Sequence, residues 1–229
     1  MRNRIQGVLI GLGLLSLGPA VVYADAPSAE IAVDRVVVRF SAPEAGGVEK
    51  PHYVLGRELG FEARLVGLAD RARPRGAQGY EAQDVEVALS RHIAETLIAD
   101  LTIDPEPSAA ESRDRAKKAQ QLAEQELGGA SFLETARTLE GLSRLEVQRI
   151  FRRRARASLY LDRMVAPMLR PTLLELRRIH QRGSTPFSSA PFESIQDPLR
   201  DWYVETRLRE AVLNYYQNAR TRLRIDYFG

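Results

Sequence analysis

The chain has 229 residues with 33 lysines and arginines, 30 aspartates and glutamates, and no cysteine. Without cysteine the protein has no disulfide bond and no cysteine that could carry a lipid anchor. The formal net charge is +3, but it falls to +1 once Arg2 and Arg4 of the first segment are set aside. A balance this close to neutral gives no indication of nucleic-acid binding.

The first 24 residues have the pattern of a secretory signal sequence. Two arginines precede an apolar run at residues 8–17, and small residues follow it up to Ala24. We expect cleavage after Ala24, or alternatively after Ala26, which leaves a periplasmic protein. The apolar run is shorter than the roughly 20 residues of a membrane-spanning helix, and glycines interrupt it.

Two segments near the ends of the mature chain have the character of β-strands. Residues 31–40 are rich in valine, and apolar residues alternate with charged ones at residues 222–227. A strand at the C-terminus needs a partner, so we predict that the two segments pair in one small sheet. Residues 41–53 contain proline and glycine and are expected to form a connecting loop.

The rest of the chain has the periodicity of α-helices, so the predicted fold class is mainly α. Apolar spacing predicts a first helix over residues 55–69 and a second over residues 81–101. Four further helix starts carry the capping-box pattern, a Ser or Thr followed three residues later by Glu. They are Ser108 with Glu111, Ser131 with Glu134, Ser143 with Glu146, and Thr172 with Glu175, and they predict helices near residues 108–127, 131–140, 143–169 and 172–181. Pro167 is expected to kink or end the third of these.

A long helix over residues 194–222 has two apolar faces that point in nearly opposite directions. The first is formed by Phe192, Ile195, Leu199, Trp202 and Tyr203, the second by Leu208, Ala211, Val212, Tyr215, Ala219 and Leu223. Two faces predict two packing partners. The start of the helix has two interpretations: Asp197 caps it with Pro198 in the first turn, or a helix that begins near Pro191 bends at Pro198.

No arrangement of residues in the sequence is typical of catalysis or of cofactor binding. His52, His92 and His180 lie in different segments without metal-ligand spacing, and His92 is expected to be structural. Serine-nucleophile and phosphate-loop motifs are missing. We therefore expect no catalytic residue, no metal and no cofactor.

One predicted helix is rich in arginine. Arg149, Arg152, Arg153 and Arg156 are expected on one cationic face. Solvation of this face, or ion pairs with acidic helices, is the favoured interpretation. Contact with anionic lipid headgroups or with an acidic partner is the alternative.

The order of these elements and several local motifs resemble the SurA-like family of periplasmic chaperones. Residues 33–38 and 54–65 resemble the family's opening strand and first helix, residues 141–163 its Gly-Leu-Ser helix entry, and residues 192–227 its long C-terminal helix and closing strand. The resemblance implies a SurA N-terminal-like helical core at residues 25–181 that residues 192–229 complete, with a small sheet joining the two ends. The connection at residues 41–53 is longer than the family's tight turn, which leaves the pairing near the first strand open.

In that family, parvulin-type prolyl isomerase domains are inserted between the two parts of the core. Here the corresponding linker, residues 182–191, has ten residues, whereas an independent domain needs about 50. The resemblance therefore implies a chaperone of the holdase type, without isomerase activity, that binds unfolded outer-membrane or envelope polypeptides. The alternative is an envelope scaffold protein that binds one dedicated partner.

An apolar cleft between the N-terminal helices and the C-terminal helix is the expected peptide-binding site. Its candidate residues have flexible or aromatic side chains that adapt to varied peptides. They are Met164, Met168, Trp202, Tyr203, Tyr215 and Tyr216. For any one of them taken alone, ordinary core packing is the favoured interpretation.

Overall fold

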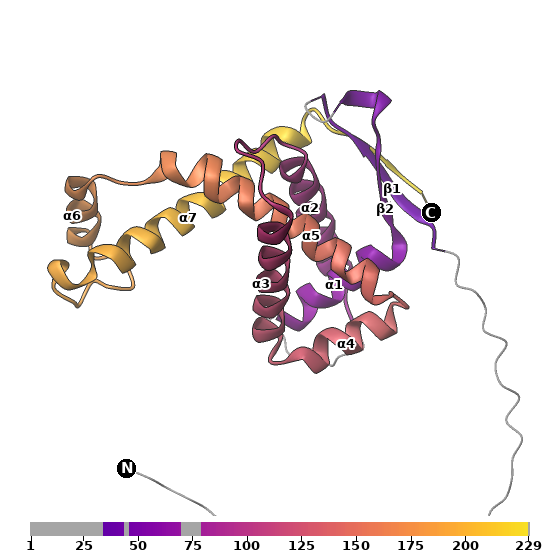
Figure 1. Ribbon diagram of the computed structural model, residues 1–229, viewed down its shortest axis with the longest axis horizontal. Coiled ribbons are helices and arrows are strands. Elements are labelled where there is room, and N and C mark those ends of the chain that lie inside the picture. Colours follow the sequence, from indigo (N-terminus) through magenta and orange to yellow (C-terminus); the bar gives the residue numbers. More distant parts are fainter. Residues whose placement is uncertain (1–33, 44–45, 70–78, 229) are drawn as a thin grey trace, which may run out of the picture. The chain divides into compact units, whose positions relative to one another are not determined.

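The computed structural model describes residues 34–43, 46–69 and 79–228 (Figure 1). The predicted signal sequence and the first residues of the predicted N-terminal strand lie outside these ranges. None of the helices within them has both the length and the apolar character that crossing a membrane requires.

A three-stranded antiparallel sheet joins the N-terminal and C-terminal parts of the described chain (Figure 1). The central strand is β1 (Val36–Ser41), and the edge strands are β2 (His52–Leu55) and β3 (Arg224–Tyr227). Arg39 in β1 lies opposite Asp226 in β3, and Nη2 of Arg39 donates to Oδ2 of Asp226 at 2.7 Å. The predicted pairing of the two terminal strands is confirmed.

Strand β2 corrects the expectation that residues 41–53 form only a connecting loop. It has four residues and runs directly into α1 (Gly56–Ala69), so its strand pattern is too short to separate from the first turn of the helix. Val54 is fully buried and pairs with Val38 of β1. The burial of this side chain anchors β2 over the helical core.

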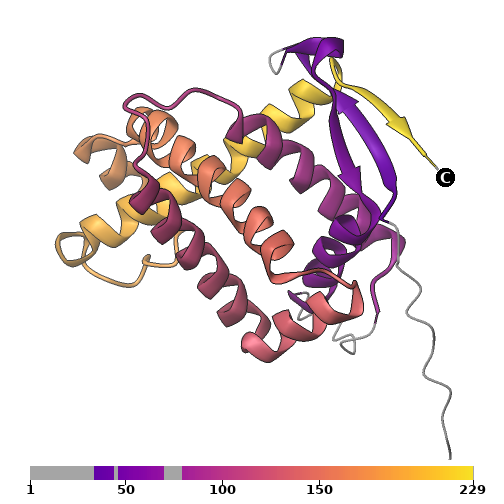
Figure 2. The same cartoon turned by 45° about the vertical axis from the view of Figure 1, so that its right-hand side comes forward.

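Seven α-helices occur in the part of the chain that the structure describes, and with the small sheet they confirm the predicted fold class. After α1 come α2 (Ala82–Ala99), α3 (Ala109–Leu127), α4 (Ala130–Leu139), α5 (Arg144–Tyr160), α6 (Leu173–Gln181) and α7 (Phe192–Arg220). Helix α5 packs against both α2 and α3 (Figure 2).

The predicted helix at residues 143–169 is α5 followed by two irregular turns. These are η3 (Leu161–Val165), a π-helical turn, and η4 (Ala166–Leu169), a 3-10 turn. Pro167 lies in η4, where it removes a backbone donor and its ring collides with the carbonyl group four residues earlier in a regular helix. The prediction that Pro167 kinks or ends the helix is confirmed.

Three of the four predicted capping positions begin a helix. Ser143 and Thr172 form complete capping boxes with their glutamates, and Oγ of Ser108 accepts from the backbone N–H of Glu111 at 3.1 Å. Each hydroxyl satisfies a backbone donor that the first helical turn leaves free.

The fourth capping prediction is wrong. Helix α4 begins directly after Gly129, whose φ of 146° lies in the region that favours glycine, and Ser131 is already inside the helix. A capping box that the sequence analysis did not include opens α2, where the side chain of Asp84 accepts from the N–H of Glu81 at 2.8 Å.

Helix α7 begins at Phe192 and contains Pro198, so of the two alternatives for its start the one with an early beginning is correct. Leu199 and its neighbours on the first apolar face pack against Leu176 of α6. Ala219, on the second face, packs beside the sheet, α1 and α2. Each face thus has its own packing partner, as the two-faced pattern predicts.

Two clusters of buried residues support the sheet and the first five helices. One includes Phe40 and Val54 of the sheet and Ile93 of α2. The other includes Phe61 of α1 and Phe151 of α5. Helix α1 contributes to both, because its two sides face the sheet and the α3–α5 group.

Candidate functional site

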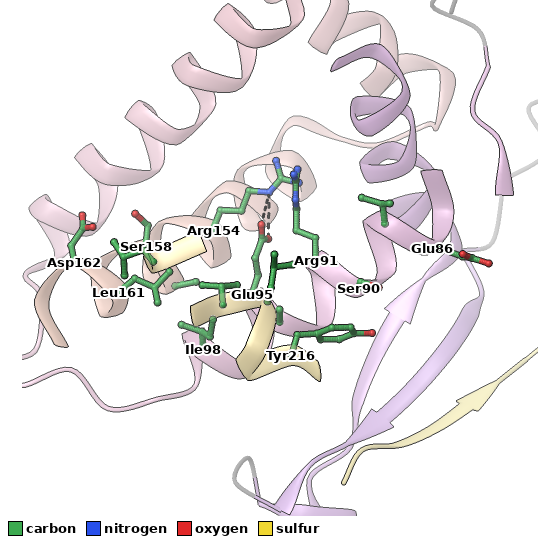
Figure 3. Close-up of a pocket in the computed structure, with 16 residues that line it drawn as sticks. Glu86, Ser90, Arg91, Glu95, Ile98, Arg154, Ser158, Leu161, Asp162 and Tyr216 are labelled. Atoms are coloured by element: carbon green, nitrogen blue, oxygen red, sulfur yellow. Dashed lines mark hydrogen bonds and ion pairs between the residues drawn. The ribbon is translucent and has the colours of Figure 1, made fainter. Parts of the chain in front are cut away.

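An apolar groove of about 670 Å³ lies between α2, α5, η3 and the second half of α7 (Figure 3). It therefore has walls from the N-terminal helices and from the C-terminal helix. This is where the sequence analysis expects a cleft.

The wall from α7 follows the helical period. Leu208, Val212 and Tyr216 recur every four residues and line the groove together with Leu213. Leu208, Val212 and Leu213 lie between the stretch of α7 that packs on α6 and the stretch that packs beside the sheet, and Tyr216 also contacts the cluster beside the sheet. The middle of the helix is therefore free to present apolar side chains to the groove.

Helix α2 forms the opposite wall with Val87, Ala94 and Ile98. Val87 is 43% exposed and Leu213 across the groove is 57% exposed, so both apolar side chains meet solvent. Exposed apolar surface that lines a concave site is typical of binding sites, whereas scattered apolar residues on a convex surface are not informative.

The floor of the groove is completed by the π-helical turn. Leu161 and Asp162 are its first two residues, and both line the groove. A π-helical turn is rare and occurs frequently at functional sites, because the extra residue reorients side chains relative to a regular helix.

A partly buried ion pair lines one side of the groove. Nε of Arg154 lies 3.3 Å from a carboxylate oxygen of Glu95, and Figure 3 shows the two side chains pointing toward each other. Burial raises the pKa of Glu95 above its ordinary value, and repulsion from Glu62 adds to this, against the opposing attraction of Arg154. The pair gives the groove a fixed polar group that can donate hydrogen bonds or accept them.

Behind this pair lies a network of buried charges. Glu62 is 1% exposed and accepts from Nη2 of Arg153 at 2.6 Å, while Nδ1 of His92 lies 2.9 Å from its other oxygen. Burial alone raises the pKa of Glu62, but the hydrogen bond to His92 and the charges of Arg153 and Arg154 outweigh it and lower the pKa to about 2. Glu62 is therefore a permanent anion that holds both arginines in place.

Glu58, Glu62 and His92 also offer one atom each within 4.8 Å of one another, a spacing that suits a metal ion. Arg153 already donates to both carboxylates, to Glu58 at 2.5 Å and to Glu62 at 2.6 Å. The guanidinium group supplies the positive charge that a metal would bring, so we interpret the cluster as a structural ion-pair network that supports the groove.

The six peptide-binding residues predicted from the sequence do not gather at one site. Tyr216 lines the groove. Tyr215, the next residue of α7, packs against the cluster beside the sheet, and Trp202 packs against the cluster shared with α6. Tyr203 is half-buried on α7.

The two predicted methionines lie in the irregular turns after α5. Met164 is half-buried in η3, and Met168 in η4 is 75% exposed. Neither lines the groove. The wall from α2 was not predicted, although Val87, Ala94 and Ile98 share a helical spacing that could have indicated it.

The four arginines predicted to share a cationic face have different surroundings. Arg153 belongs to the buried network, and Arg156 pairs with Glu106 and donates to the carbonyl oxygen of Ala99. Arg149 and Arg152 are exposed. Ion pairs with acidic residues, the favoured interpretation, thus describe Arg153 and Arg156, and contact of the others with a membrane stays a prediction.

Comparison of the chain with protein-family models, with curated proteins and with solved structures gives no significant match. The resemblance to the SurA-like chaperones stays a prediction from the sequence.

Proposed function

We propose that the protein is a periplasmic chaperone of the holdase type that binds apolar segments of unfolded envelope polypeptides in the groove between α2, α5 and α7. The observation that carries this proposal is the apolar lining of the groove with exposed side chains on both walls, Val87 and Leu213. The signal-like sequence at residues 1–24 supports an exported protein.

The groove binds a client by removing apolar surface from water. Each Å² of apolar surface that both sides bury contributes about 25 cal/mol. Ordering an unfolded segment costs conformational entropy, and only the surplus appears as affinity. The binding is therefore weak and tolerant of sequence, as delaying aggregation requires.

The polar groups of the groove orient the client backbone. Arg91 and the Arg154–Glu95 pair lie beside apolar residues of α2 and α5, where an extended peptide presents unpaired N–H and C=O groups. The buried network behind Arg154 keeps its guanidinium group in place. The function requires no catalytic step and no cofactor.

Light scattering of an outer-membrane porin diluted from urea tests this function. The unaltered protein is expected to suppress aggregation. L213E places a charge in the apolar groove and is expected to abolish the suppression. Because Leu213 is 57% exposed, the variant is expected to fold, which circular dichroism checks.

L174E is the matched control. Leu174 is 59% exposed on α6 and lies outside the groove, so this variant introduces the same charge and is expected to keep full suppression. If L213E suppresses aggregation as well as the unaltered protein, the groove is not the client site. If the unaltered protein has no effect at severalfold excess, the dedicated-scaffold alternative replaces the chaperone.

A further inference from the structure

A second groove, of about 320 Å³, lies between α3 and α5. Arg113 and Lys117 line it from α3, and Arg152 lines it from α5. Its other polar lining comes from the amides of Gln120 and Gln148, and no carboxylate contributes to it. We call it the cationic groove.

The three cations converge because of helical spacing and packing. Arg113, Lys117 and Gln120 lie at positions i, i+4 and i+7 on one side of α3. Gln148 and Arg152 have the same i, i+4 relation on α5, and the two helices pack side by side (Figure 2).

Several other arginines of these helices have a carboxylate partner, although the exposed Arg144 and Arg149 form no ion pair with a described residue. Arg115 pairs with Asp162, Arg154 with Glu95, and Arg156 with Glu106. In contrast, among residues 34–43, 46–69 and 79–228 no carboxylate lies within ion-pair distance of Arg113, Lys117 or Arg152. Arg113, Lys117 and Arg152 are all exposed, so solvent screens their mutual repulsion, and three like charges line one concave site that an anion can reach.

We propose that the cationic groove binds a phosphate group. A single carboxylate matches one guanidinium group, whereas a phosphate carries more charge and offers oxygens in several directions to three cations. The glutamine amides of Gln120 and Gln148 add neutral donors on both helices. The site is separate from the apolar groove, so this proposal does not depend on the chaperone function.

Two sources can supply the phosphate: a free phosphate or phosphate ester, or the headgroup of an anionic lipid. The first arm of the test measures thermal unfolding in millimolar sodium phosphate against sodium chloride of equal ionic strength. A bound anion is expected to raise the melting temperature as its concentration rises. The double variant R113Q/R152Q is expected to lose this shift.

The second arm measures sedimentation with phosphatidylglycerol vesicles and with phosphatidylcholine vesicles. If the source is a lipid, the protein sediments with the phosphatidylglycerol vesicles only. R113Q/R152Q is then expected to bind these vesicles at least about tenfold more weakly, because charge-assisted hydrogen bonds are lost. A phosphate-dependent shift in the first arm indicates the free anion instead.

K118Q/R178Q is the control, because it removes the same charge from exposed positions outside the groove. It is expected to behave like the unaltered protein in both arms. The proposal is overturned if neither arm detects binding, or if the control loses as much binding as R113Q/R152Q.

Discussion

The carboxylate of Glu62 links three helices through hydrogen bonds and ion pairs. It comes from α1 and contacts His92 of α2 and both Arg153 and Arg154 of α5. A buried carboxylate costs several kcal/mol unless hydrogen bonds and opposite charges compensate it. Arg154 pairs with Glu62 and also with Glu95, which lines the apolar groove. The network therefore holds a polar side chain of the groove in position.

Replacing Glu62 by Gln is expected to destabilise the fold by about 3–5 kcal/mol at pH 7, because Arg153 and Arg154 lose the most deeply buried of their anionic partners. Urea denaturation followed by circular dichroism measures the loss. E126Q, at an exposed position of α3, is the control and is expected to change stability by less than about 0.5 kcal/mol. Equal unfolding midpoints for the two variants would mean that the network contributes nothing to stability.

The same residue predicts a dependence on pH. Its pKa is about 2 in the folded protein and 4.5 without the fold, so the folded state binds the proton more weakly. The stability that Glu62 contributes is therefore complete above pH 4.5 and is lost as the pH falls from 4.5 to 2. The free energy of unfolding of E62Q, measured across this interval, is expected to fall less steeply than that of the unaltered protein.

Single-residue roles of this kind were only partly accessible from the sequence. Helical spacing places Arg153 on a face of α5, but its partners Glu58 and Glu62 lie more than 90 residues earlier in the chain. Nothing local in the sequence indicates such a pair. His92 was expected to be structural, and the structure adds that its partner is Glu62.

The helices and strands follow local sequence patterns more closely than the single-residue contacts do. The capping-box pattern predicts one helix start correctly and another wrongly. Ser143 and Ser131 are each followed by Glu at the third position, yet only Ser143 caps a helix. Gly129 occupies the capping position before α4, two residues ahead of Ser131, since its backbone adopts a conformation that other residues avoid. The pattern predicts a helix start, and a neighbouring glycine shifts it.

Because Ser143 caps a helix and Ser131 does not, replacing each by Ala is expected to change the stability of the protein by different amounts. S143A removes the acceptor for the N–H of Glu146 and is expected to destabilise the protein by about 1 kcal/mol. S131A lies within the first turn of α4 and is expected to be neutral or slightly stabilising, because alanine favours the helix. Thermal unfolding of both variants measures the difference, and an equal loss would show that Ser143 does not act as a cap.

For the molecule as a whole, the class of fold was predictable and the sites were not. Period-2 and period-3.6 patterns give strands and helices directly, and the need of the last strand for a partner gives the β1–β3 pair. The apolar groove instead requires the crossing of three helices that are distant in sequence. Of the predicted site residues only Tyr216 lines the groove, although it also contacts the cluster beside the sheet; Tyr215 contacts that cluster alone, and Trp202 packs against the cluster shared with α6.

The pairing of β3 with β1 predicts that the C-terminal segment supports the whole core. Truncation after Arg222 removes Leu223 and Ile225, which pack against the cluster beside the sheet, and leaves one side of β1 without hydrogen-bond partners. Lost apolar burial and backbone hydrogen bonds together are expected to cost about 3 kcal/mol or more. Thermal unfolding measures the loss, and hydrogen exchange is expected to be faster at the amides of Arg39 and Ser41, which point toward β3.

Y227A is the control for this truncation. Tyr227 is 70% exposed and lies at the end of β3, so its removal keeps the strand pairing and is expected to cost less than about 1 kcal/mol. The contact of α7 with α6 lies near the start of α7, far from β3. The α7 amides at this contact are expected to keep their protection from hydrogen exchange in the truncated chain until the whole protein unfolds. An unchanged melting temperature after truncation would show that β3 contributes nothing to the stability of the core, and the prediction would be wrong.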